Sequence, residues 1–222
     1  MSESTPSRWR RRKEARPGEI IHAALACFQE RGFAATRLED VAVRAGVTKG
    51  TIYLYYPSKE DLFKAVIQSE LVPNLESLES ALDPSGSALE QLQQLFTVFV
   101  HHIAPSPASV IPKLVLAEAG NFPEIARFYR ETVAERGLRL IRAILNRGIT
   151  RGEFRPVDVD QVVFCIIGPL IFSLLAKQSL TGVDGHPIDL AAVCRAHLDL
   201  LGHGLLRDPS VQLPTLSPSG EA

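Results

Sequence analysis

The stretch that decides the fold is "TRLEDVAVRAGVTKGTIYLYYPSKEDL", which runs from Thr36 to Leu62. It holds two short segments with helical spacing, separated by the small-residue sequence Ala45-Gly46-Val47. Two helices joined by a short glycine-containing turn form a helix-turn-helix, in which the second helix enters the major groove of DNA. The pattern predicts such an element, although small residues at the crossing point also suit ordinary helix packing.

Capping residues mark where these helices start. Thr36 and Glu39 have the spacing of a capping box, with Thr36 as the cap and Glu39 reaching back to it. Thr48 caps a further helix that runs to about Tyr55. Ser58, with an acidic residue three positions later, starts the next helix by the same capping chemistry.

The spacing of apolar residues is helical nearly throughout, and convincing strand alternation is absent. We therefore expect an all-α fold of about nine helices. Upstream of the quoted stretch, "PGEIIHAALACFQERGF" predicts a helix that ends at Gly32, a natural residue just past a helix end. Beyond the quoted stretch the predicted helices are Ser87–Ile103, Val110–Ala119, Pro123–Arg151, Val159–Ser179 and Ile188–Leu206.

Charge is distributed unevenly along the 222 residues, whose formal net charge is −1. From Arg8 to Lys59 there are eleven basic and five acidic residues, a balance of +6, which leaves −7 for the remainder. A basic quarter on an acidic body suggests that one end meets a polyanion. The N-terminus has no apolar signal segment, and three widely spaced cysteines are typical of reduced thiols, so we expect a cytoplasmic protein.

From Gly18 to Leu71 the chain resembles the DNA-binding domain of the TetR/AcrR family of bacterial transcriptional regulators. The matching residues are "IIHAALACFQERGFAATRLEDVAVRAGVTKGTIYLYYPSKEDLF". A later stretch, "FPEIARFYRETVAERGLRLIRAILNRGITRGEFRPVD", resembles the C-terminal region of a subgroup of that family. The resemblance implies a three-helix head and a helical ligand-binding and dimerisation body. The expected domains are a basic disordered arm (1–16), the head (17–62, with helix 4 continuing to about 72), the body (73–207) and a flexible tail (208–222).

The resemblance also implies which residues contact DNA. Lys49 and Gly50 fall where family members approach base edges, while Thr51, Leu54 and Tyr55 face the groove or the phosphates. Positions that clamp phosphates are occupied by Thr36, Tyr53 and Lys59. With Arg37 and Thr48 these residues make up the expected DNA-binding set.

Two positions depart from the family pattern, and several have a structural alternative. Tyr55 stands in place of the more usual His, and Tyr56 in place of the more usual Phe, so the Tyr56 hydroxyl needs a partner. Ile52 and Tyr56 suit a core role, and Tyr53 suits either role. The basic run from Arg8 to Arg16 is either a solvated leader or an arm that follows phosphates.

The body carries no catalytic sequence motif, so we expect neither an enzyme nor a cofactor. The adjacent His101 and His102 point about 100° apart on a helix, which argues against a shared metal ion. Aromatic residues are numerous, and an apolar pocket between helices is the usual site of a small ligand. The candidate pocket residues are Phe96, Phe99, Phe128 and Phe172.

The longest apolar run, 162–176, is shorter than the ~20 residues that a membrane crossing needs, and it contains Gly168 and Pro169. It therefore favours a protein interface, and we expect a homodimer through helices 159–179 and 188–206. The resulting hypothesis is a repressor that binds a double-stranded, pseudo-palindromic operator and is released by a hydrophobic small molecule. The alternatives are a DNA-binding regulator controlled by a protein partner, or a helical-bundle enzyme or carrier.

Overall fold

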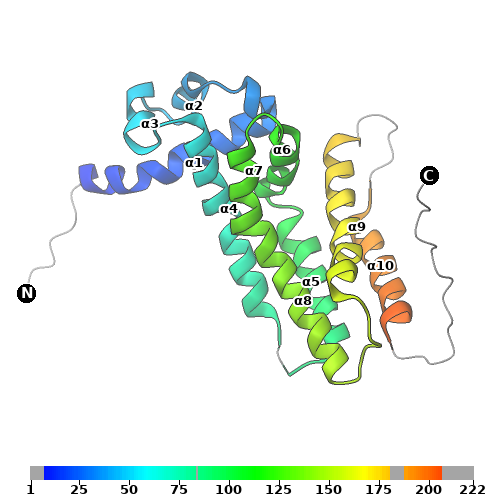
Figure 1. Cartoon of the computed structure of the whole chain (residues 1–222). Helices are drawn as coiled ribbons and strands as arrows, with labels where there is room; N and C mark the ends of the chain where they lie inside the picture. Colours follow the sequence, from blue (N-terminus) through cyan, green and yellow to red (C-terminus); the bar gives the residue numbers. More distant parts are fainter. Residues whose placement is uncertain (1–7, 84, 181–187, 207–222) are drawn as a thin grey trace, which may run out of the picture.

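The computed structural model describes residues 8–83, 85–180 and 188–206, which form a helical head and a longer helical body (Figure 1). The head contains α1 (Arg8–Ala35), α2 (Leu38–Arg44) and α3 (Lys49–Tyr55). Helix α4 (Lys59–Ala81) runs from the head along the body, in contact with α1 and α7. The remaining helices are α5 (Ala88–Val98), α6 (Ile111–Glu118), α7 (Pro123–Tyr129), α8 (Glu135–Thr150), α9 (Val159–Ser179) and α10 (Leu190–Leu205).

The all-α prediction is confirmed, because the described residues form no strand beyond one isolated bridge, between Phe154 and Leu206. The bounds of α9 are those expected. The expected helix Pro123–Arg151 is instead α7, a π-helical turn at Arg130–Ala134, and α8. A second π-helical turn, Phe99–Ile103, follows α5. Such turns are rare single-turn insertions in α-helices, and they were not predicted from the sequence.

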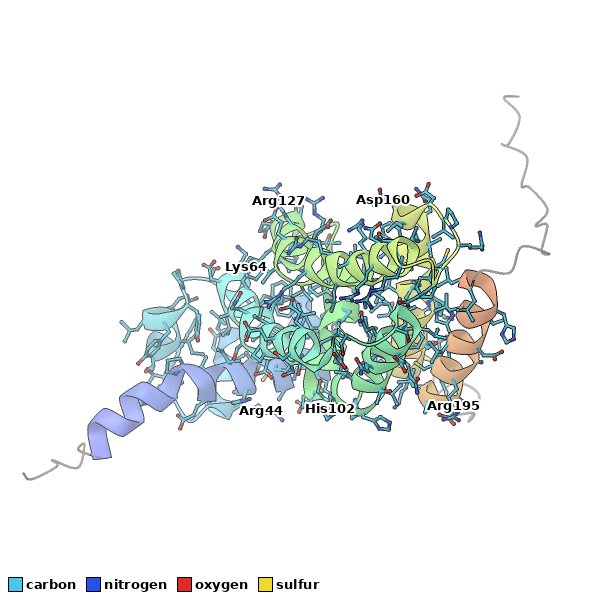
Figure 2. The ribbon with its side chains drawn as sticks, turned by 90° about the horizontal axis from the view of Figure 1, so that it is seen from below. Arg44, Lys64, His102, Arg127, Asp160 and Arg195 are labelled. Atoms are coloured by element: carbon cyan, nitrogen blue, oxygen red, sulfur yellow. The ribbon has the colours of Figure 1, made fainter. Side chains whose placement is uncertain are left out.

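Helix α1 begins at Arg8, where the sequence predicted a disordered arm over residues 1–16. Helix α1 thus includes part of the expected arm, and arginine, lysine, glutamate and alanine are all good helix formers. The first turns of α1 project from the head in both views (Figures 1 and 2). Residues 1–7 and the predicted tail 208–222 lie outside the described residues.

The core of the head is aromatic. The ring of Phe63 from α4 lies 5.1 Å from that of Phe28 and 5.0 Å from that of Phe33, both on α1. Ile52 of α3 is fully buried against this cluster, which confirms its expected core role. Two ion pairs across the surface, Arg31 with Asp40 at 2.9 Å and Arg44 with Glu30 at 2.6 Å, join α1 to α2.

Two of the three predicted helix caps are confirmed. Thr48 Oγ1 accepts from the backbone N–H of Thr51 at 3.2 Å, and Ser58 Oγ accepts from the N–H of Asp61 at 3.0 Å. The capping box at Thr36 is wrong. Arg37 is the residue before α2, and the Thr36 hydroxyl instead donates backward to the Gly32 carbonyl at 2.7 Å.

Gly32 explains why the Thr36 hydroxyl turns toward α1. Its φ of 80° interrupts the helical geometry of α1, a conformation that glycine adopts without a side-chain penalty. The break leaves carbonyls at the end of the regular helix without helical partners. The Thr36 side chain is only 2% exposed, and its single hydroxyl hydrogen is shared between the Gly32 carbonyl at 2.7 Å and the Cys27 carbonyl at 3.2 Å.

The body has its own core between α5, α8, α9 and α10. Leu92, Ile144, Ile166, Leu170 and Leu174 are almost fully buried in it. Helix α8 lies against α5 at Gly148, where an added Cβ would be 2.7 Å from the Cβ of Ala88 and 2.5 Å from the Phe154 ring. A glycine is therefore required there for the helices to pack at this distance.

The outer face of α9 remains uncovered. Phe164 and Phe172 are 56% and 68% exposed, and Leu200 on the neighbouring α10 is 70% exposed. By length and composition alone, α9 is the one helix among the described residues that is apolar enough to cross a membrane, with a mean hydropathy of 2.1. Figure 1 shows α9 and α10 side by side at the edge of the body farthest from α4.

Candidate nucleic-acid interface

The α2–turn–α3 unit presents one face of α3 to solvent. Gly46, with φ of 63°, forms the turn, and its left-handed backbone is one that L side chains rarely adopt. Ile52 anchors α3 to the core. The exposed face opposite is formed by Lys49, Gly50, Tyr53 and Leu54, with Thr48 exposed at its start. This is the geometry that a helix needs to enter a groove.

Lys49 is held by a residue that the sequence analysis assigned elsewhere. Its Nζ lies 2.5 Å from Glu39 Oε1 on α2, and 5.6 Å from the centre of the Tyr53 ring. The hydrogen bond to Lys49 lowers the pKa of Glu39 below 4.5, and the same bond raises the pKa of Lys49. In the free protein Lys49 is therefore charged and tied to α2.

The tyrosines of α3 have separate positions. Tyr53 is 46% exposed, and Tyr55 is half-buried. Tyr56 is also half-buried, and its hydroxyl donates to the Pro17 carbonyl at 3.5 Å, which supplies the partner that a tyrosine in place of phenylalanine requires. Burial raises the pKa of Tyr56 above 10. Tyr56 therefore belongs to the contact between α3 and α1.

Lys59 has a different place from the one expected. Its Nζ donates to the carbonyls of Phe33, Ala34 and Thr36 at 2.8, 3.0 and 3.2 Å. An ammonium group has three donors, so this arrangement uses all of them. In this structure Lys59 thus caps the carbonyl end of α1, and its expected phosphate contact stays a prediction. The hydroxyl of Thr36 likewise points inward, toward the Gly32 carbonyl.

Arg37 is the basic residue of the expected set that remains available. It is exposed at the start of α2 and makes no ion pair with another described residue. A guanidinium group there is able to donate two hydrogen bonds to one phosphate. The outward-facing members of the expected set are therefore Arg37, Thr48, Lys49, Gly50, Tyr53 and Leu54, with Thr51 and Tyr55 half-buried beside them.

The head and the body are joined by a contact that the sequence does not predict. The backbone N–H of Ala34 donates to Glu118 Oε1 of α6 at 3.3 Å, and the Phe33 ring meets that of Phe122, just before α7, at 5.0 Å. We call these four residues the head–body junction. No signal in the sequence identifies it, because the partners lie more than eighty positions apart and share no motif.

The expected ligand-pocket residues do not come together. Phe96 and Phe99 are buried in the body core, whereas Phe128 packs against the head-side cluster. Phe172 faces solvent, so it lines no pocket within the described chain. A surface hollow in the body is lined by other, mostly polar residues: Asp83, Gly86, Glu90, Gln93, Gln94, Thr97 and Val98. The described residues contain no cluster of side chains suited to a metal ion.

Family comparisons match both parts of the chain. Residues 20–66 match the family model "Bacterial regulatory proteins, tetR family", and residues 82–193 match "Tetracyclin repressor-like, C-terminal domain". The repressor KstR2 of Mycobacterium tuberculosis is 33% identical over 150 residues, which cover 67% of this chain and 74% of that protein. The fatty acid metabolism regulator protein of Bacillus subtilis is 26% identical over 203 residues, covering 87% and 98% of the two chains.

Solved structures are also similar to this chain over most of its length. FadR from Bacillus subtilis, in complex with stearoyl-CoA, is 25% identical and has a TM-score of 0.74, with 84% of this chain and 98% of that chain covered. The ketosteroid regulator KstR2 of Mycobacterium tuberculosis is 26% identical with a TM-score of 0.64, covering 92% and 98%. The similarity therefore extends over head and body together.

Proposed function

Since the chain belongs to the TetR family of bacterial regulatory proteins, we propose that it is a dimeric repressor released from a pseudo-palindromic operator by a hydrophobic small molecule. Membership in the family makes it a DNA-binding transcriptional regulator and not an enzyme. The observation that carries the proposal is the exposed face of α3, held outward by the Thr48 cap and the buried Ile52. A protein that binds the bacterial chromosome acts in the cytoplasm.

In the proposed complex α3 lies in the major groove, and α2 crosses the DNA backbone. The ion pair between Lys49 and Glu39 breaks, and Lys49 contacts the DNA instead. Arg37, at the start of α2, contacts a phosphate. The basic residues of the α1 extension, from Arg8 to Arg16, follow the flanking phosphates. This assignment keeps the expected DNA-binding set with the exception of Thr36 and Lys59.

The proposed dimer interface is the uncovered face of α9 together with the exposed side of α10. Apolar faces of this kind are buried when the same helices of two copies pair across a two-fold axis. Phe164 and Phe172 of α9 and Leu200 of α10 are exposed apolar residues of these two helices. In the proposed dimer the partner subunit covers the apolar face of α9, so no membrane is needed to cover it.

The proposed ligand is apolar because the candidate region around Phe96 and Phe99 is apolar. The Phe96 ring stacks on His197 of α10 at 5.4 Å, and the π-helical turn that begins at Phe99 interrupts the regular helix beside it. Such turns are frequent at functional sites. Binding of stearoyl-CoA by the FadR relative supports a ligand with a long acyl chain. Phe128 and Phe172 are removed from the proposed pocket.

Ligand release is proposed to act through the head–body junction. The proposed dimer has one conformation in which the spacing of its two heads fits the operator and another in which it does not. A ligand that binds the second conformation more tightly weakens operator binding, and the size of the effect is set by the difference in its affinity for the two conformations. A coupling of ~1–3 kcal/mol corresponds to a fall of about 5–150-fold in operator affinity. The strongest evidence would be this fall on addition of a compound that also raises the melting temperature.

The test is a panel of acyl-CoA thioesters of different lengths, with free fatty acids and coenzyme A alone as comparators. Operator affinity and melting temperature are measured for each compound on the same preparation. We expect at least one long-chain compound to weaken operator binding and stabilise the protein, and coenzyme A alone to do neither. Unchanged affinity and melting temperature across the panel would contradict the apolar ligand and favour control by a protein partner.

A further inference from the structure

In the DNA-free chain, polar side chains at the start of α3 have partners within the protein. Lys49 is paired with Glu39 at 2.5 Å, and the hydroxyls of Thr48 and Thr51 are 2.9 Å apart in a mutual hydrogen bond. Leu54 differs from these residues, because it is 83% exposed and apolar. It is therefore the side chain on this face that gains most from burial against an apolar partner.

Gly50 lies one helical turn before Leu54 on the same face. A Cβ built there would meet only Thr48 Oγ1, at 3.8 Å, so the space in front of α3 at this point is open. Without a side chain at Gly50 the backbone of α3 is able to approach the base edges closely. A close approach brings Leu54 within reach of groups that project from the floor of the groove.

The major groove presents one apolar group on its base edges, the C5-methyl of thymine. Cytosine, adenine and guanine present hydrogen-bond donors and acceptors there, which an aliphatic side chain does not satisfy. We propose that Leu54 selects a thymine in each operator half-site by packing against its C5-methyl group. The proposal rests on the proposed DNA-binding function and specifies the base that α3 reads.

Replacement of thymine by deoxyuridine tests this directly, since it removes the methyl group and leaves the hydrogen-bonding groups of the base unchanged. Each thymine of a duplex recovered by in vitro selection is replaced in turn, symmetrically in both half-sites, and the affinity of the full chain is measured. Burial of one methyl group corresponds to a factor of about four, so a symmetric replacement at the Leu54 position should weaken binding about sixteenfold.

The variant Leu54→Ala should bind the thymine and deoxyuridine duplexes equally at that position. Leu116→Ala is the matched control, because Leu116 is an exposed leucine of α6 in the body, and it should keep the full difference. Val43 on α2 is another highly exposed aliphatic side chain of the head, at 82%. Val43→Ala should also keep the difference in affinity between the thymine and deoxyuridine duplexes.

Three results would overturn the proposal: no thymine position sensitive to deoxyuridine, a difference that persists in Leu54→Ala, or a difference lost in Val43→Ala instead. Failure of the proposed function is distinguishable from each of these. A protein that binds no duplex sequence-specifically is not the proposed repressor, whereas one that binds a selected duplex and tolerates deoxyuridine throughout refutes only the role of Leu54.

Discussion

The rings of Phe33 and Phe122 meet edge to face with their centroids 5.0 Å apart, which ties the end of α1 in the head to the start of α7 in the body. The Ala34 N–H adds a hydrogen bond to Glu118 beside this contact. Aromatic pairs of this geometry contribute about 0.5–1.5 kcal/mol beyond their buried area. The junction is therefore a packed contact between head and body, and we propose that it carries part of the ligand coupling.

Phe122→Leu should weaken the ligand response more than DNA binding itself. The leucine keeps the site apolar but removes the edge-to-face contact, so operator affinity of the free protein should change less than about threefold. The ligand-induced fall in affinity should shrink. The melting temperature of the same variant is the control for a general loss of packing. An unchanged ligand response in Phe122→Leu would exclude the junction from the coupling.

Lys59→Met and Arg37→Gln should separate a structural cation from a DNA-contacting one. Loss of the Lys59 cap leaves the carbonyls of Phe33 and Ala34 in α1, and that of Thr36 just after it, without this donor, which should lower the free energy of unfolding by about 1–3 kcal/mol. Arg37→Gln should leave stability unchanged and flatten the salt dependence of operator binding by about one unit per subunit. A flatter salt dependence with unchanged stability in Lys59→Met would instead support the phosphate contact that the sequence suggested for Lys59.

Glu39→Gln should tighten operator binding, most clearly at low salt. The change removes a negative charge beside the DNA and frees Lys49 from its partner at 2.5 Å. Glu124→Gln, an exposed glutamate on α7 in the body, is the control and should have little effect. Weaker binding by Glu39→Gln would mean that Glu39 positions Lys49 for the DNA.

The same pair has a pH signature. Because the pKa of Glu39 is lowered below 4.5 in the folded protein, the stabilisation from its pairing with Lys49 is present above that pH and is lost as the pH falls through the lowered value. A carbon-detected NMR titration should show Glu39 titrating below 4.5, and Lys49→Met should raise its pKa. A titration unaffected by Lys49→Met would show that the pair does not form in solution.

If the proposed dimer forms through α9, Phe172→Asp should convert it to a monomer without unfolding the chain. Phe172 is 68% exposed in the single chain, so the aspartate is solvated in the monomer and opposes only pairing. Leu174→Asp would be unsuitable for this purpose, because Leu174 is 1% exposed and lies in the body core. Leu116→Asp on the exposed side of α6 is the control. Light scattering that shows a parent monomer at micromolar concentration would contradict the dimer.

Local sequence signals predicted the parts of the fold that local chemistry determines. Thr48 and Ser58 cap their helices as expected, and α9 has its predicted bounds, because caps and apolar spacing act within a few residues. The direction of long side chains was not predictable in this way. Lys59 reaches carbonyls 23 to 26 positions earlier, which depends on how α4 crosses α1.

The ligand pocket was the least predictable part of the site. Aromatic composition predicts that rings will be buried, but it does not distinguish a core ring from a pocket ring or from an interface ring. Phe96, Phe128 and Phe172 fall in three different environments: the body core, the head-side cluster and the exposed face of α9. Only the packing of the helices separates them.

The central claim is sequence-specific operator binding by a dimer through α3, and selection of bound duplexes from a random DNA library tests it most directly. We predict enrichment of a pseudo-palindromic sequence that binds with a Kd near or below ~10⁻⁸ M at moderate salt, as two subunits per duplex. Recovery of no enriched sequence, or binding that is equally tight to unrelated duplexes at every salt concentration, would contradict it.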